Sequence, residues 1–579
     1  MKNKIIITIT VLLFSIKIIY SQSTVDGYKT IPEERVFIHH NTSFLFTGEY
    51  LYYKVYCLNA KTKILSDLSK IAYVELINEK KEIVFKHKIK LKNGLGQGDF
   101  FLPVSLSSGN YKLIGYTQWM KNFGVSNFFL GDLAILNPYQ GNQKTILADS
   151  ISLLKTSTPS KIDVTTPAVS IITNKKIFGK REKVQVSLKG INEMLPKGNY
   201  SFSVRKLDTI KTPDIPTITS FHKKLKTVNT LIDQDSKSIA LPELRGELIC
   251  GKITGKDSGF NVENQKITFS IPGKNYEVKI ATTDIDGNFC FNLNNEYVEN
   301  KGYIEVLSDN DKYIIELKPQ TPNVYKDLKF NQFKITKEMK DLIVKRSVYN
   351  QIRNRYFSVK PDTLSPVEET LPFYGNGAEV YNLDDYTRFP TLQETLVEVV
   401  NNVWIKKIEN DKYIFQVRYK YPPYNEPEHL PLVIIDGLII KDHTVLIDLD
   451  ARKVKSISVS RDKHYLGAQI FQGIVDIKTK KGDYYKTINK NGINEIALFK
   501  PLPLKKYFVQ QYNSEKKKES KRIPDFRNQL IWLPNVSLDK RSSIITFFTS
   551  NNTGQFELIL EGYSDKGVPV FAREIIAVK

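Results

Sequence analysis

The sequence predicts a mainly β, multidomain protein in which tandem β-sandwiches are joined to one small α/β domain. The 579 residues are several times the length of an ordinary domain, so the chain needs several hydrophobic cores. Tyr and Phe number 31 each, and an aromatic-rich composition favours half-buried strands over helical bundles. Strand-length alternating runs recur between turn residues at short intervals, a pattern typical of β-sandwiches.

Residues 1–21 have the pattern of a secretory signal peptide. Lys2 and Lys4 precede an apolar run over residues 5–16, and small residues follow where cleavage would occur. A membrane anchor is the alternative, but Lys17 shortens the apolar run below the roughly 20 residues that a span needs. No Cys lies near the junction, so we expect an exported chain without a lipid anchor.

The first domain predicted is a β-sandwich over residues 34–138. Alternating runs predict strands at 44–58, 71–76, 83–91 and 111–116, separated by turns that contain Gly or Asn-Gly.

A short motif recurs along the chain and predicts further domains of the same type. It reads GNYKL at 109–113, GNYSF at 198–202 and GQFEL at 554–558, and each copy starts an alternating run. The repetition predicts a second, short β region at 161–212 and a C-terminal β-sandwich at 487–579.

Residues 243–320 form another predicted β-sandwich. Short strands contain Cys250 and Cys290, and Asp286-Gly287 predicts a hairpin turn. The two thiols would leave the same non-core face if their strands pair. Reduced thiols are the expectation and a disulfide is the alternative. The three Cys residues have no metal-type spacing, so no zinc site is predicted.

Two helices are predicted in the second half of the chain. Residues 336–357 carry an apolar stripe and would form a helical linker. Residues 391–404 place apolar side chains at helical spacing, and Thr391 with Glu394 fits a capping box. Strands then follow to complete a small α/β domain at 371–485, and the charged run 515–522 would be a solvated loop.

The first two sandwich types resemble known families. Residues 34–138 resemble a macroglobulin-like (MG2-like) domain through segments that read ERVF at 34–37, FTGE at 46–49, YVEL at 73–76 and SGNY at 108–111. The same motif predicts that the 161–212 and 487–579 regions are further domains of this type. Residues 243–320 are similar to a carboxypeptidase-regulatory-like (transthyretin-like) domain through GKI at 251–253 and TDIDGNF at 283–289.

The α/β domain resembles the plug domain of TonB-dependent outer-membrane receptors. The similarity lies in PLVIIDG at 431–437, YLG at 465–467 and, most specifically, GIVDIKTKKG at 473–482. Together the resemblances imply a Bacteroidetes-type outer-membrane-associated protein. Only 97 residues follow Gly482 in this sequence, too few for a receptor barrel, so we expect a plug-like domain without its own pore.

Catalytic and metal-binding patterns point to no enzyme. The seven His residues have no metal-ligand spacing, and His39-His40 is expected to be an exposed pair. Asp436-Gly437 is interpreted as a tight turn and not as a catalytic carboxylate. The macroglobulin-like regions lack the C-G-E-Q thioester of that family. We therefore predict no catalytic, cofactor-binding or metal residues and no cofactor.

Charge and motifs together predict the function class. Lys and Arg total 84 against 62 Asp and Glu, a net charge of +22, yet 15 of the basic residues are Arg. Nucleic-acid sites favour Arg for its forked guanidinium, so no nucleic-acid partner is expected, only weak contact with anionic lipid or glycan. We expect a non-enzymatic accessory or scaffold subunit of an outer-membrane complex, on its periplasmic or cell-surface face. The alternative is a TonB-linked uptake component whose plug-like domain acts in trans on a separate β-barrel.

Overall fold

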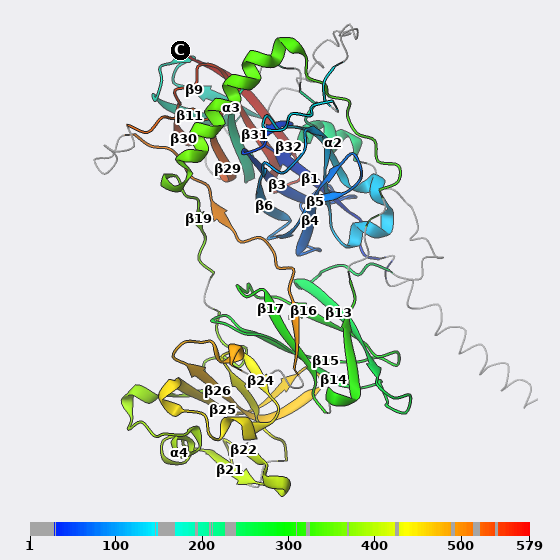
Figure 1. Ribbon diagram of the computed structural model, residues 1–579, viewed down its shortest axis with the longest axis vertical. Helices are drawn as coiled ribbons and strands as arrows, with labels where there is room; N and C mark the ends of the chain where they lie inside the picture. The colour runs from blue at the N-terminus through cyan, green and yellow to red at the C-terminus, as the bar shows by residue number, and fades with distance from the viewer. Residues whose placement is uncertain are drawn as a thin grey trace, which may run out of the picture. The chain divides into compact units, whose positions relative to one another are not determined.

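The computed structural model describes most of the chain, in sixteen stretches. These are residues 28, 30–144, 146–148, 168–190, 195–207, 210, 212–225, 239–308, 310–319, 323, 325–367, 370–422, 428–487, 493–512, 522–538 and 542–579. The signal peptide predicted at 1–21, and most of the charged run at 515–522, lie outside them. The predicted fold class is confirmed, because the described chain is mainly β and forms several sheets in more than one domain (Figure 1).

The chain divides into two compact units, each built from separate stretches of sequence. Unit 1 comprises Met1–Leu244, Asn323–Ser365 and Pro501–Lys579, and unit 2 comprises Arg245–Pro322 and Pro366–Lys500. The short 3₁₀ helices of the described chain are η1 (Trp119–Phe123), η2 (Val125–Asn127), η4 (Asn310–Lys312), η5 (Lys337–Met339), η6 (Phe357–Val359), η7 (Leu383–Asp385), η8 (Glu409–Asp411), η9 (His443–Leu446), η10 (Ala451–Lys453) and η11 (Tyr484–Lys486).

Unit 1 begins with a two-sheet sandwich. One sheet has the strand order β1-β3-β6 and the other β2-β8-β7-β4-β5, with a core of apolar and aromatic side chains between them. Its strands are β1 (Glu34–His40), β2 (Phe44–Phe46), β3 (Tyr50–Asn59), β4 (Ile71–Asn78), β5 (Ile83–Lys90), β6 (Leu95–Phe101), β7 (Gly109–Tyr116) and β8 (Phe129–Leu136). The central strand β3 is buried on both faces, because Tyr56 and Lys54 bond to the second sandwich of the unit.

The second sandwich of unit 1 corrects the prediction of two separate domains at 161–212 and 487–579. Strands from both regions interleave in one sandwich, with sheets β30-β11-β9 and β10-β32-β31-β12-β29. The strands are β9 (Val169–Thr173), β10 (Ile177–Phe178), β11 (Lys183–Gly190), β12 (Gly198–Lys206), β29 (Gln529–Leu538), β30 (Ser542–Phe548), β31 (Gly554–Ser564) and β32 (Pro569–Val578).

The physical reason is that neither region has enough strands to cover its own apolar face. Val184, Val186 and Leu188 alternate along β11 and are fully buried, in a core that takes most of its side chains from residues 530–578. The recurring motif indeed starts strands, and β12 pairs antiparallel with β31 from Gly198 opposite Ser564. The two copies are therefore neighbours in one sheet.

Helices and a small strand pair complete unit 1. They are α2 (Ile218–Lys224), α3 (Lys340–Arg355), β19 (Thr363–Leu364) and β28 (Lys505–Lys506). The helix predicted at 336–357 is present as η5 and α3, but it is not a free linker. Its Arg346 is buried and binds Glu49, while Tyr349 stacks on Phe526 with ring centroids 4.2 Å apart. Packing therefore fixes α3 against both sandwiches of unit 1.

Unit 2 begins with a sandwich of two sheets, β16-β13-β18 and β15-β14-β17-β27. Its strands are β13 (Glu247–Gly255), β14 (Lys266–Ile271), β15 (Glu277–Thr282), β16 (Asn288–Leu293), β17 (Lys301–Val306), β18 (Tyr313–Leu317) and β27 (Asn494–Ala497). The predicted start of the C-terminal sandwich at residue 487 is too early. Strand β27 lies after it but pairs with β17 of unit 2 and not with the C-terminal sandwich.

Two local predictions in this sandwich are wrong. Cys250 and Cys290 form a disulfide, because they are direct cross-strand partners on β13 and β16 with Cα atoms 4.1 Å apart. Asp286-Gly287 does not close a hairpin, since β15 and β16 belong to different sheets. The turn instead crosses between the sheets, and the Asp284 carboxylate accepts the backbone N–H groups of Asp286 and Asn288.

The remainder of unit 2 is an α/β domain with the sheet order β20-β25-β26-β23-β24 and a hairpin, β21-β22. Its elements are β20 (Glu379–Asn382), α4 (Leu392–Glu398), β21 (Val403–Lys407), β22 (Tyr413–Val417), β23 (Leu432–Ile435), β24 (Leu438–Ile440), β25 (Val454–Leu466) and β26 (Gln469–Thr479). The predicted helix 391–404 is too long. Thr391 does cap α4 by accepting the Glu394 N–H, but the chain turns at Asn402, which has φ of 65°, and Val403 begins β21.

The predicted core of this domain is confirmed. Val433 lies opposite Val475, and Ile435 opposite Ile477, on the parallel pair β23 and β26, and all four are at most 1% exposed. One face of the sheet packs against α4 and the β21-β22 hairpin. The other packs against Val278 and Ile280 of the preceding sandwich, so unit 2 covers both faces with its own residues.

Candidate functional site

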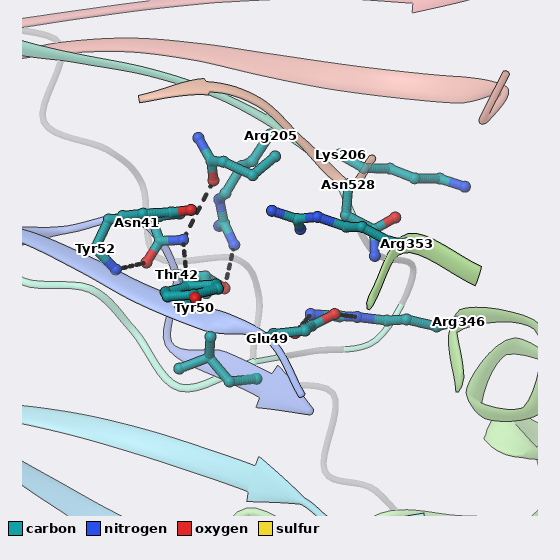
Figure 2. A pocket seen from close by; sticks show the side chains of 12 residues that line it. Asn41, Thr42, Glu49, Tyr50, Tyr52, Arg205, Lys206, Arg346, Arg353 and Asn528 are labelled. Carbon is teal, nitrogen blue, oxygen red and sulfur yellow. Dashed lines mark hydrogen bonds and ion pairs between the residues drawn. The ribbon is translucent and has the colours of Figure 1, made fainter. Parts of the chain in front are cut away.

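A cleft in unit 1 lies where its two sandwiches meet α3. It consists of two adjoining hollows of about 400 and 540 Å³, open mouths included. The first lies among β3, β12, β29 and α3 and is drawn in Figure 2. The second continues past the end of α3 to residues 507–508. Tyr52, Arg353 and Gln529 line both hollows, so the two form one cleft.

Aromatic rings line the cleft in a continuous row. Tyr50 and Tyr52 are two residues apart on β3, so their side chains leave the same face, and their rings stack at 5.6 Å between centroids. Tyr52 also stacks on Trp532 at 6.2 Å, and Tyr50 on Phe357 at 5.7 Å. Tyr507 meets Tyr52 edge to face at 5.0 Å. The row therefore joins β3, β29 and the segment after α3.

Cationic side chains converge on the first hollow. Arg346 donates to both Glu49 carboxylate oxygens, at 2.9 and 2.8 Å. Arg205 donates to Thr42 Oγ1 at 2.6 Å, and Lys206 to Asn552 Oδ1 at 2.6 Å. These three cations are held by groups of the protein.

Arg353 differs from the other cations. It lies seven residues after Arg346, two turns along the same side of α3, and extends into the hollow (Figure 2). Among the residues that the structure describes, its guanidinium has no hydrogen-bond or ion-pair partner. Burial raises the pKa of Tyr50 to about 12, and the charge of Arg353 acts against that rise. Arg353 thus presents unpaired donors to whatever enters the cleft.

The second hollow has its own buried charges. Arg527 donates to both oxygens of Asp525, and Lys360 lies 3.5 Å from the same carboxylate. Burial also raises the pKa of Asp362, whose Oδ1 accepts the Phe508 N–H at 2.9 Å. Trp532 is 3% exposed and its Nε1 is buried without a hydrogen-bond partner.

The prediction that His39-His40 is an exposed pair is wrong. The His39 ring packs against Trp532, with 5.1 Å between the ring centroids. Both rings are buried, His39 at 2% and His40 at 1% exposure, because the end of β1 is covered by the second sandwich. His39 Nδ1 lies 2.5 Å from Ser201 Oγ, and Nε2 lies 3.5 Å from Glu561 Oε2. Burial, and then the charges of neighbouring cations, lower the pKa of His39. Burial raises the pKa of Glu561 to about 8, although its carboxyl accepts the Ile218 N–H.

Glu561 gives an expected pH dependence of stability. Its pKa rises on folding from 4.5 to about 8, so folding favours the protonated carboxyl and its stabilisation is lost as the pH rises towards 8. His39 acts in the opposite sense, because its lowered pKa in the folded state leaves only the unfolded chain to bind a proton near pH 6.5, and this effect is the same in Glu561→Gln. Between pH 6.5 and 8 we therefore expect the free energy of unfolding of the wild type to fall by about 1.5 kcal/mol relative to that of Glu561→Gln. Urea denaturation of the wild type and of Glu561→Gln measures it, and an equal fall in both would contradict the assignment.

The other residues singled out in the sequence do not join the cleft. Asp436-Gly437 is the predicted tight turn, with φ of 49° and 85° between the paired β23 and β24. The Asp436 carboxylate accepts bonds from Thr479 N and Oγ1 and from Tyr484 N, so its role in the turn is structural. His443 accepts the Phe415 N–H, and His464 bonds to Ser460. Within the described stretches, no group of three or more His, Cys, Asp or Glu residues could hold a metal ion.

Sequence reasoning selected none of the cleft residues. The alternation of Tyr50 and Tyr52 and the spacing of Arg346 and Arg353 were available signals. Neither distinguishes a binding face from ordinary sheet and helix surface. The cleft gathers residues between 41 and 532, which only the tertiary structure brings together.

Comparisons with known proteins give distant structural similarity. No family model matches the chain, and no curated protein matches it. Trypsin-activated alpha-2-macroglobulin from Escherichia coli is similar at 9% identity and a TM-score of 0.22, covering 96% of this chain and 42% of that one. Salmonella alpha-2-macroglobulin reacted with methylamine is similar at 8% identity and a TM-score of 0.23, covering 94% and 39%. The Escherichia coli adhesin FdeC is similar at 9% identity and a TM-score of 0.14, covering 48% and 63%.

This chain therefore spans about two fifths of the length of those macroglobulins. TM-scores this low support no inference about ligands or partners. Among the described helices, none is long and apolar enough to cross a membrane.

Proposed function

We propose that the chain is a non-enzymatic, exported accessory or scaffold subunit of an outer-membrane protein complex. The observation that carries the proposal is the cleft of unit 1, whose unpaired groups are the Arg353 guanidinium and the Trp532 N–H beside a row of aromatic rings. Such groups hold a ligand by donating hydrogen bonds and stacking, and do not supply a nucleophile with its base. The site thus favours binding over chemistry.

The outer-membrane location rests on the signal-peptide pattern and on the plug-like motif at 473–482. In this proposal the α/β domain of unit 2 docks on an outer-membrane β-barrel protein or complex. Both faces of its sheet are covered within unit 2, and the edge strand β24 is buried, which leaves the other edge strand, β20, as the docking surface. Val380 on that strand is 59% exposed, and an open edge can pair with a strand of another chain.

The proposal predicts that the full chain, tagged and purified from outer-membrane extracts, retains one outer-membrane protein at stable stoichiometry in high salt. Salt should release little of it, because an apolar, strand-paired interface is weakly screened. We expect Val380→Glu to reduce the retained protein at least tenfold, because it places a charge at the edge of β20. The measurement is quantitative mass spectrometry of the eluate, repeated with the tag on the retained protein.

Val445→Glu is the matched control, since Val445 is 58% exposed and belongs to η9 and not to β20. Retention should be unchanged in that variant. Complete release by moderate salt, or equal retention by Val380→Glu and the control, would refute docking through β20.

A further inference from the structure

The cleft of unit 1 has donors that the protein itself does not use. Arg353 has five N–H donors and no hydrogen-bond or ion-pair partner in the described chain. Trp532 Nε1 is buried and unpaired, and a buried donor left without an acceptor costs about 1–3 kcal/mol. Asn528 also lines the first hollow, and its Oδ1 accepts a bond from Asn552. A ligand rich in acceptors would satisfy the donors of Arg353.

The charge at the cleft is positive once internal pairs are set aside. In the first hollow, Glu49 is fully engaged by Arg346. The carboxylate that lines the second hollow is Asp362, whose Oδ1 accepts the Phe508 N–H, and the charge of Arg353 acts against the rise that burial causes in its pKa. Arg353 lines both hollows, and in the described chain neither Glu49 nor Asp362 forms an ion pair with it. An anionic group that reaches Arg353 would gain a forked, charge-assisted pair of hydrogen bonds in a partly desolvated site.

The aromatic row indicates which kind of uncharged group the ligand carries beside its anionic group. Phe357 is 41% exposed, and its ring stacks on Tyr50 at an interplanar angle of 15°. Phe357 and Tyr507 both line the second hollow, which Arg353 joins to the first. Sugar rings present apolar C–H faces to aromatic rings and hydroxyl acceptors at their edges.

We propose that this cleft binds an anionic saccharide, with its acidic group on Arg353 and its sugar ring against Phe357 and Tyr507. The proposal deepens the binding function above by naming a ligand class, and it rests on that function. The acidic group has two sources, the carboxylate of a uronate or the phosphate of a sugar phosphate. Both fit the guanidinium fork, and binding measurements distinguish them.

The test is isothermal titration calorimetry of the full mature chain with an oligogalacturonide, glucose 6-phosphate and the neutral oligosaccharide maltotriose. We expect one acidic probe to bind at least tenfold more tightly than maltotriose. We expect Arg353→Gln to weaken that binding at least tenfold, because the charge and the fork are both lost. Arg355→Gln is the matched control on the same helix, since Arg355 does not line the cleft, and it should change affinity less than twofold.

A second variant keeps the proposal falsifiable if Arg353→Gln is poorly folded. Phe357→Ala removes a half-exposed ring and should weaken the same acidic probe at least fivefold. A preference for the oligogalacturonide identifies a uronate, and a preference for glucose 6-phosphate a sugar phosphate. The proposal is overturned if neither acidic probe binds, if maltotriose binds equally well, or if Arg353→Gln and Arg355→Gln behave alike. Retention of the outer-membrane protein would persist in that case, so failure of the ligand class is distinguishable from failure of the proposed function.

Discussion

Replacing Val475 with aspartate is expected to unfold the α/β domain of unit 2. Val475 is fully buried at the centre of the sheet, opposite Val433 on one side and Val459 on the other. An unpaired carboxylate there would have to be desolvated without a hydrogen-bond donor, at a cost of about 5 kcal/mol. That is comparable with the whole stability of many domains.

Hydrogen exchange of the full chain, followed by mass spectrometry, measures this effect locally. We expect the peptides over β23 and β26 to lose most of their protection, while those over the sandwiches of unit 1 keep theirs. Val445→Asp is the matched control, because Val445 is 58% exposed and its variant should exchange as the wild type does. Unchanged protection of β26 in Val475→Asp would contradict the assigned core.

Removing the guanidinium of Arg346 is expected to free α3 from unit 1. Arg346 is 8% exposed, and it donates to both oxygens of Glu49 and to the Phe44 carbonyl, at 3.1 Å. Its guanidinium also lies 4.6 Å from the centroid of the Phe46 ring. Arg346→Ala would leave Glu49 buried and without its cation, which costs about 3–5 kcal/mol. The peptide covering α3 should therefore lose its exchange protection.

The double variant Arg346→Met with Glu49→Gln tests the cause. It removes both charges, and the amide oxygen of Gln can still accept the Phe46 N–H that Glu49 accepts at 2.9 Å. We expect at least half of the lost protection to return, since the penalty is mainly the uncompensated carboxylate. The single variant Arg346→Lys should retain less protection of α3 than the double variant regains, because an ammonium lacks the forked geometry that binds both Glu49 oxygens. A double variant no better than Arg346→Ala would show that lost packing is the main cause.

The two expected effects differ in how readily the sequence predicts them. The burial of Val475 follows from strict alternation around 473–478, because a strand period of two assigns alternate side chains to one face. The partnership of Arg346 with Glu49 spans 297 residues and leaves no local pattern. The segment predicted as a helical linker is therefore a helix packed against unit 1, and its C-terminal end carries the cleft residue Arg353.

Pairing between distant strands explains the remaining differences. The motif copies at 198 and 554 each predict a strand, and both are strands, but the sequence cannot say that they pair with each other. The disulfide depends in the same way on register, because Cys250 and Cys290 bond only since β13 and β16 place them directly opposite. Likewise His39-His40 is polar and near a strand end, which favours exposure, yet the second sandwich covers it.

By itself the sequence determined the mainly β fold class, most strand positions, the cap of α4, the Asp436-Gly437 turn and the core of the α/β domain. These features depend on neighbours within a few residues, where periodicity, capping and turn conformation act. Tertiary structure alone decided that 168–206 and 529–578 share one sandwich, that α3 is fixed by a buried ion pair, and that Arg353 stands unpaired beside an aromatic row. Those features depend on which apolar faces find each other across hundreds of residues, because a strand or helix must bury its apolar face but carries no local signal that names its partner.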